Sequence, residues 1–109
     1  RVAFYGSTRL YWPVFEQHDL IDLGEKLNAM VRKGEWDKIG AEVSDEVVHL
    51  FAAVGTHDKI AAAIEKRFGG VSDMVSAIAA PDAEPGLTPD LIQDLQRIET
   101  PFQGFRTDY

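Results

Sequence analysis

The sequence contains no cysteine among its 109 residues, which excludes disulfides, thiolate-held metal ions and cysteine nucleophiles. Positive charge is also scarce, with 11 Lys and Arg against 18 Asp and Glu and a net charge of −7. This balance argues against nucleic acid or an anionic membrane as the main partner. No apolar run approaches the roughly 18 residues of a membrane span, and no signal peptide heads the sequence. We therefore expect a cytoplasmic protein.

Familiar catalytic and phosphate-binding motifs are missing as well. The sequence has no G-x-S-x-G, G-x-x-x-x-G-K-[ST] or G-x-G-x-x-G segment. Its three histidines, His18, His49 and His57, are not three or four residues apart, so no helix offers a two-histidine metal site. We expect no metal ion.

What the chain does have is a globular composition, with 45% hydrophobic and 10% aromatic residues. Its length permits one small domain or one piece of a larger domain. The sequence begins at Arg1 rather than at methionine. We interpret this as a trimmed start or as a fragment.

Capping residues, glycine and proline divide most of the chain into predicted helices. Asp19 as N-cap and Gly34 as stop mark one of them, in which apolar residues recur on one face at i, i+3, i+7, i+10 and i+11. Ser44, Thr56 and the run from Thr88 mark three further starts. The helices are expected near residues 11–17, 19–33, 35–42, 44–54, 56–68 and 88–99.

Two short segments are predicted to be strands. Residues 1–6 resemble the end of a strand that runs into a turn, and residues 71–79 follow a glycine pair with apolar residues on both faces. A strand needs a partner to satisfy its backbone, which points to missing neighbours. A buried helix or an extended loop at 71–79 is the alternative. The predicted class is thus mainly α, with five to six helices and one or two short strands.

Two groups of residues are candidates for a site. Asp82 and Glu84 lie in the loop after the predicted strand 71–79, at the end where parallel sheets bind ligands; the alternative is a solvated acidic loop without a site. An aromatic group near the start either belongs to the core or forms a wall for a planar ligand; it comprises Tyr5, Tyr11, Trp12 and Phe15.

Six short segments follow one another in an order and spacing that form a pattern. They are residues 2–8 (VAFYGST), 23–28 (LGEKLN), 34–37 (GEWD), 44–47 (SDEV), 54–56 (VGT) and 67–70 (RFGG). In this order they resemble the C-terminal portion of the luciferase-like monooxygenase family, and most closely its actinobacterial, deazaflavin-dependent branch. The family commonly has proline after the Ser-Thr, where this chain has Arg9, and glycine after the histidine that corresponds to His18, where this chain has Asp19.

The resemblance implies a (β/α)₈ barrel that binds a flavin or a deazaflavin at the carboxyl ends of its strands and transfers a hydride or activates oxygen. A typical barrel needs about 250 residues, so this chain would be the C-terminal part of one. It would contain a helical excursion at 7–43, the last αβα unit at 44–99 and a tail at 100–109. The catalytic groups and most contacts to FMN or to a coenzyme of the F420 type would lie upstream.

The resemblance also implies that the helical excursion covers the barrel mouth. The residues expected to line a cofactor or substrate site there are Ser7, Thr8, Tyr11, Trp12 and His18. Hydroxyls beside Gly6 would hold a phosphate or carboxylate at a helix N-terminus, or would only cap the helix. The expected partners are the rest of the barrel, a small-molecule substrate and further copies in a homo-oligomer.

A second hypothesis needs no missing sequence. Five or six capped amphipathic helices can bury a core by themselves, which is typical of a free-standing helical interaction or structural domain without catalytic activity.

Overall fold

The computed structural model describes residues 1–76 and 86–101. This part of the chain is mainly helical, with six α-helices and two short 3₁₀ helices, and it contains no strand. The chain divides into two compact units, which we call unit 1 (Arg1–Ala52) and unit 2 (Ala53–Tyr109). The prediction of a mainly α chain is confirmed.

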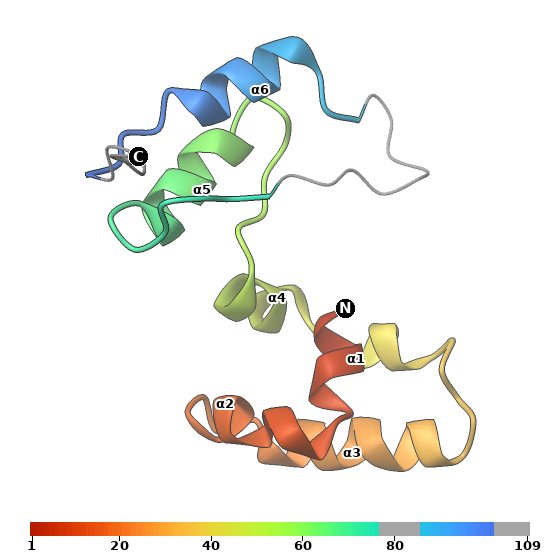
Figure 1. Ribbon diagram of the computed structural model, residues 1–109. Coiled ribbons are helices and arrows are strands. Elements are labelled where there is room, and N and C mark those ends of the chain that lie inside the picture. The colour runs from red at the N-terminus through yellow and green to blue at the C-terminus, as the bar shows by residue number, and fades with distance from the viewer. Residues whose placement is uncertain (77–85, 102–109) are drawn as a thin grey trace, which may run out of the picture. The chain divides into compact units, whose positions relative to one another are not determined.

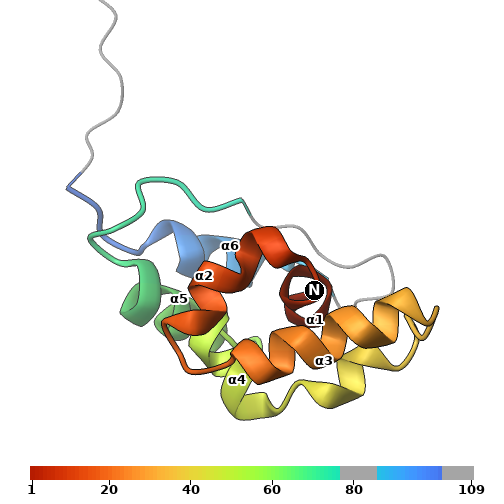
Figure 2. The same cartoon turned by 90° about the horizontal axis from the view of Figure 1, so that it is seen from below.

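Unit 1 is a cluster of short helices around one longer helix. The short helix α1 packs on the longer α3 and on η2, and runs across the axis of α3 (Figures 1 and 2). The elements are α1 (Val2–Gly6), η1 (Arg9–Tyr11), α2 (Trp12–Glu16), α3 (Ile21–Arg32), η2 (Ile39–Glu42) and α4 (Asp45–Phe51).

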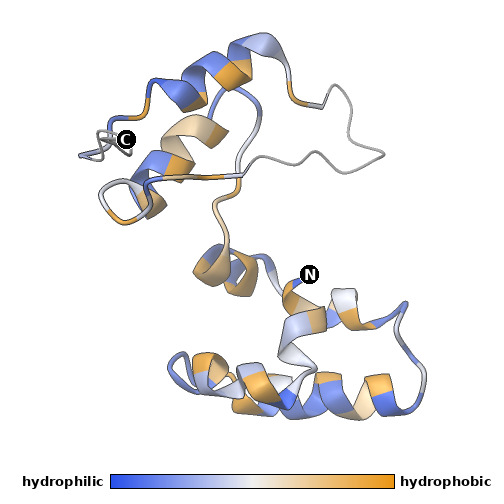
Figure 3. Ribbon diagram, viewed as in Figure 1, coloured by the Kyte–Doolittle hydropathy of each residue, from blue (hydrophilic) through white to orange (hydrophobic). Residues whose placement is uncertain are grey.

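Four elements each contribute one residue to the core of unit 1. Ala3, Phe15, Leu27 and Ile39 form a cluster in which Leu27 has no exposed surface. The apolar face that was predicted for the helix at 19–33, which is α3, packs around this cluster through Leu23, Met30 and Val31. Polar residues occupy the opposite side of α3 (Figure 3).

Both ends of α3 are shaped by left-handed backbone. Asp19 has φ 56°, so the helix begins at Ile21 with Leu20 as N-cap, one residue later than predicted. Gly34 has φ 81° and ends the helix as predicted. The Gly34 N–H bonds to Val31 O at 2.9 Å and the Glu35 N–H to Met30 O at 3.0 Å, which is the hydrogen-bond pattern of a Schellman motif.

The prediction of a strand end at residues 1–6 is wrong, because Val2–Gly6 is helix α1. A helix satisfies its backbone locally, as in the 2.9 Å bond from Ser7 N–H to Ala3 O, and needs no neighbouring strand. The predicted helix at 35–42 is also too long. Residues 36–38 form a turn, closed by Lys38 N–H on Glu35 O, and only η2 follows.

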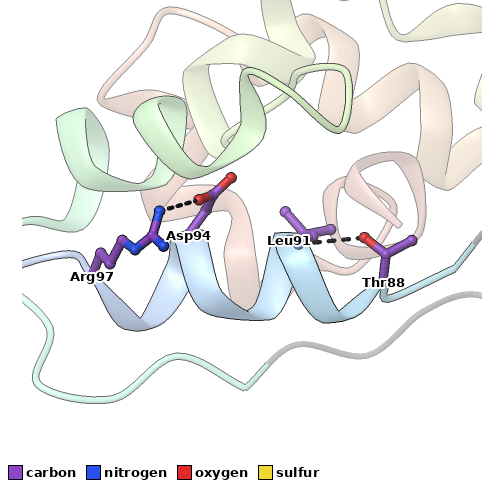
Figure 4. Close-up of polar contacts among 4 residues, drawn as sticks. All are labelled: Thr88, Leu91, Asp94 and Arg97. Atoms are coloured by element: carbon purple, nitrogen blue, oxygen red, sulfur yellow. Dashed lines mark hydrogen bonds and ion pairs between the residues drawn. The ribbon is translucent and has the colours of Figure 1, made fainter.

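Unit 2 contains α5 (Ile60–Phe68) and α6 (Pro89–Gln96), which pack on each other. The cap prediction at Thr88 is confirmed, since the Leu91 N–H donates to Thr88 Oγ1 at 3.3 Å, one turn before the ion pair of Asp94 and Arg97 (Figure 4). Ser44 likewise accepts from the Val47 N–H at the start of α4.

The end of α4 and the start of α5 differ from the prediction. Helix α4 ends at Phe51 rather than at residue 54, and Val54 is exposed. Thr56 does not cap α5 with its side chain; its hydroxyl donates to the Asp58 carboxylate, and its carbonyl accepts from Ile60 N–H at 2.8 Å. The turn that these bonds close delays the helix to Ile60.

Residues 71–76 are turn and irregular backbone, so the predicted strand at 71–79 is wrong over its described part. The N–H groups of Val71 and Ser72 bond to Phe68 O at 3.0 and 2.9 Å, which closes the C-terminal end of α5 instead of starting a ladder. Residues 77–79 of that prediction lie outside the described residues.

The close packing at Gly6 generates a prediction. A Cβ there would lie 2.3 Å from Phe15 Cζ and 3.0 Å from Leu27 Cδ1, and both of these side chains are buried. Gly6→Ala is therefore expected to lower the free energy of unfolding by about 1–3 kcal/mol. Urea unfolding followed by tryptophan fluorescence measures this, because both tryptophans, Trp12 and Trp36, lie in unit 1.

Gly40→Ala is the matched control, since a Cβ at Gly40 meets no atom within 4 Å. It is expected to be neutral or stabilising by up to about 1 kcal/mol. Equal stability of the Gly6 and Gly40 variants would contradict the packing described for α1.

The cap at Thr88 generates a second prediction. Thr88→Ala removes the acceptor for the Leu91 N–H and is expected to destabilise α6 by about 1 kcal/mol, whereas Thr88→Ser keeps the acceptor. Amide hydrogen exchange along α6, measured by NMR, should show about fivefold less protection in the alanine variant than in the serine variant. The same protection in both would show that the cap does not hold the helix.

Candidate functional site

The hydroxyls of Ser7 and Thr8 lie at the carboxyl end of α1. Ser7 Oγ donates to Phe4 O at 2.7 Å, and Thr8 Oγ1 approaches the same oxygen at 3.4 Å. Thr8 also precedes η1, but its side chain does not cap that helix. Ser7 is buried, whereas Thr8 is exposed. The two hydroxyls thus bond to a carbonyl in the last turn of a helix, whereas the anion interpretation placed them at a helix N-terminus.

Trp12 joins three helices of unit 1. Its Nε1–H donates to Gly6 O at 2.9 Å, which satisfies a carbonyl at the end of α1 that has no partner within the helix. The indole lies against Gly24 of α3, where a Cβ would be 3.0 Å from Nε1. The Arg9 guanidinium stands 5.6 Å from the ring centroid, within the range of a cation–π contact.

Asn28 adds a second polar bond at the place where α1, α2 and α3 meet, which we call the junction. Its Nδ2–H donates to Ser7 O at 2.8 Å, so that α3 holds the backbone just after α1. The junction therefore rests on residues from two of the quoted segments, 2–8 and 23–28. Gly24 and Asn28 were not singled out from the sequence; their spacing of four residues places them on one side of α3, which is the signal that could have found them.

Tyr5 and Tyr11 meet on the surface of unit 1, with ring centroids 4.9 Å apart in an edge-to-face arrangement. Phe4 lies 5.6 Å from Tyr5 and 6.1 Å from Trp36. We call these four residues the aromatic surface; each is 41–52% exposed. Of the predicted aromatic group, Tyr5 and Tyr11 belong to this surface, Phe15 to the core and Trp12 to the junction.

The sequence reasoning missed Phe4 and Trp36. Trp36 falls within the predicted helix at 35–42, but it lies in the turn before η2 and is half-exposed. Phe4 falls within the predicted strand end at 1–6, and a strand does not predict the side on which its ring lies in helix α1.

His18 lies apart from the other predicted site residues. Its ring is exposed and stands edge-on to Phe51 at 5.3 Å, while Phe51 stacks on Phe15 at 5.4 Å. The structure thus brings Ser7, Thr8 and Trp12 to one end of α1 and Tyr11 to the aromatic surface, and it places His18 against α4.

Unit 2 contains a cavity of about 280 Å³ between α5, α6 and the segment 72–75. Seven apolar side chains form most of its wall: Ile64, Phe68, Met74, Val75, Ile92, Leu95 and Ile98. Asp73 and Glu99 add carboxylates to the lining.

Two further polar contacts of unit 2 lie outside this lining. His57 Nε2 lies 2.7 Å from Gly86 O, and the hydrogen bond from the Thr56 hydroxyl lowers the pKa of the exposed Asp58 carboxyl.

Within residues 1–76 and 86–101, no group of three or more His, Asp or Glu side chains could hold a metal ion. Asp82 and Glu84, which the sequence suggested as site residues, lie outside the described residues. Among the helices that the structure describes, none is both long and apolar enough to cross a membrane.

Comparison with known proteins finds relatives without a described activity. The chain is 44% identical over 78 residues to the uncharacterized protein Mb1395 of Mycobacterium bovis and to the uncharacterized protein Rv1360 of Mycobacterium tuberculosis. The match covers 72% of this chain and 23% of each relative, so the chain spans about a quarter of the relatives' length. No protein-family profile matches the chain, and no solved structure matches it.

The bond from Trp12 generates a third prediction. Trp12→Phe keeps a ring but removes the donor to Gly6 O, and is expected to lower the free energy of unfolding of unit 1 by about 1–3 kcal/mol. Trp36→Phe is the matched control; Trp36 is half-exposed, so its loss should cost less than about 0.5 kcal/mol.

Urea unfolding followed by circular dichroism compares the two variants, and each retains one tryptophan whose fluorescence reports on unit 1. An equal effect of the two substitutions would show that the bond to Gly6 does not stabilise the junction.

Proposed function

We propose that this chain is part of a luciferase-like oxidoreductase or monooxygenase that uses a flavin or deazaflavin cofactor, and that its fold belongs to the C-terminal portion of a (β/α)₈ barrel. The observation that carries the proposal is the ordered series of segments that resemble that family. Two of these segments, 2–8 and 23–28, meet at the junction of α1 and α3 through Gly6, Gly24 and the Asn28 bond to Ser7. The resemblance therefore falls on residues that pack together.

The backbone at Asp19 supports the same proposal. The family commonly has glycine after the histidine at this place in the pattern, and Asp19 has φ 56°, a conformation that glycine adopts without strain. A position that requires left-handed backbone explains why glycine is common there and why aspartate, which tolerates this region better than most residues, can replace it.

The size of the relatives is also compatible with a barrel. A match of 78 residues that covers 23% of each relative makes those proteins about 340 residues long. This length lies within the range of (β/α)₈ barrels, roughly 200 to more than 400 residues. A chain of 109 residues would then contribute only a part of the site.

In this proposal the residues of unit 1 help to position and enclose the cofactor or substrate and take no part in the chemical step. Trp12, Ser7 and Thr8 fix the end of α1, and Tyr11 with the rest of the aromatic surface offers apolar area to a planar ring or to the remaining barrel. The hydride chemistry belongs to the cofactor, whose main contacts would come from the upstream part.

The experiment is an absorbance and fluorescence titration with coenzyme F420 and with FMN. It uses two proteins, the 109-residue chain and the full-length Mycobacterium tuberculosis relative. We expect the relative to bind one cofactor saturably at micromolar concentration and the short chain to bind neither. AMP, which carries a phosphate without the isoalloxazine ring, is the control ligand and should not bind. If the relative bound neither coenzyme F420 nor FMN, the proposal would be contradicted.

A second candidate function is a free-standing helical interaction domain. The observation that favours it is the core of unit 1, in which Ala3, Phe15, Leu27 and Ile39 all come from the first 52 residues. The aromatic surface would then be the interaction site. Absence of cofactor binding by the relative, together with cooperative thermal unfolding of the monomeric 109-residue chain, would favour this alternative.

A further inference from the structure

The cavity of unit 2 has the character of a ligand site. Helices α5 and α6 pack on each other (Figure 1), and both contribute residues to the lining. The segment 72–75 and the residues after α6 complete it. Met74 is 80% exposed and Ile92 is 39% exposed, so apolar surface around the cavity remains in contact with water. A volume of about 280 Å³ is near the lower end of small-molecule pockets.

Charge in the lining has one sign. Asp73 and Glu99 are the charged residues among those that line the cavity in the described part of the chain, and both are acidic. Thr100 Oγ1 donates to Asp73 Oδ1 at 3.4 Å. A carboxylate accepts hydrogen bonds at both oxygens, so this bond leaves Asp73 able to accept another donor.

The two arginines that neighbour lining residues in the sequence both have partners. The Arg67 guanidinium stands 5.8 Å from the Phe68 ring centroid, and Arg97 pairs with Asp94 at 3.2 Å. Neither arginine belongs to the lining. The wall is thus apolar with two carboxylates, which complements a ligand with an apolar body and a positive end.

We propose that this cavity binds a small amphipathic primary amine, with an apolar body of about six to ten carbon atoms and one ammonium group. The body displaces water from the apolar wall, which stabilises the complex in proportion to the buried area. The ammonium group donates to Asp73 and Glu99, whose exposure spares both charges a large desolvation cost. An alcohol of the same length lacks the charge, and a carboxylate of that length is repelled.

This inference goes beyond the proposed function and does not rest on it, because the probes contain no flavin and the experiment uses the 109-residue chain. The probes are hexylamine, 1-hexanol and hexanoate, which share one body and differ in charge. The readout is the NMR shift of the Met74 methyl group, which lines the cavity, with the Met30 methyl of unit 1 as internal reference.

We expect hexylamine to shift the Met74 signal saturably, with about tenfold higher affinity than 1-hexanol, and hexanoate to bind more weakly than both. An exposed charge pair contributes at most about fivefold, and about threefold from each of two such pairs gives the difference of about tenfold. The preference should shrink as salt rises from about 20 mM to about 0.5 M, since salt screens exposed charges. The Met30 signal should not move.

Three variants assign the preference to the two carboxylates. The double variant Asp73→Asn/Glu99→Gln should bind hexylamine as weakly as 1-hexanol, and Glu99→Gln alone, which keeps the Asp73–Thr100 bond, should lose about threefold. Asp94→Asn is the matched control, because Asp94 lies on α6, five residues before Glu99, and is not part of the lining. It should retain the preference.

Three results would overturn the inference: no saturable shift of Met74 with any probe, equal affinity for hexylamine and 1-hexanol, or the same loss in Asp94→Asn as in Glu99→Gln. Unchanged binding of 1-hexanol by the Glu99→Gln variant is part of the expected result, since it shows that the cavity keeps its shape.

Discussion

The close approach of α1 to its neighbours at Gly6 is the constraint on which unit 1 depends. Only hydrogen fits in the place of a side chain there, because a Cβ would lie 2.3 Å from Phe15 Cζ and 3.0 Å from Leu27 Cδ1. The Gly6 carbonyl in turn accepts the Trp12 indole N–H. One residue thus lets α1, α2 and α3 share a core and ties their ends together. The position of the aromatic surface follows, since Phe4 and Tyr5 belong to α1 and Tyr11 immediately precedes α2.

Local signals in the sequence predicted several helix boundaries and one buried helix face correctly. Ser44 and Thr88 cap helices as expected, Gly34 ends α3, and the apolar spacing of α3 identified its buried face. The failure at residues 1–6 is non-local. Helix α1 packs on α3 and η2, contacts that no periodicity in so short a segment reveals, and the composition of the segment suggested a strand instead.

The candidate site was predictable in part for the same reason. Tyr5 and Tyr11 could be grouped because they are close in the sequence. Trp36 is 32 residues from Phe4 in the sequence and contacts it only in the folded unit. Ser7 and Thr8 were expected at the start of a helix and lie at the end of one, a reversal that follows directly from the missed helix α1. The cavity of unit 2 depends on residues 64–75 and 92–100 coming together, which the sequence pattern does not indicate.

The central claim is that the Trp12 bond to Gly6 fixes the junction of α1, α2 and α3, and hydrogen exchange of the two indole N–H groups tests it most directly. Trp12 is partly buried and bonded, whereas Trp36 is half-exposed, so the protein contains its own reference. The Trp12 indole proton should exchange at least about tenfold more slowly than that of Trp36, as protection follows the opening of the surrounding structure. Equal exchange rates for the two indoles would contradict the account.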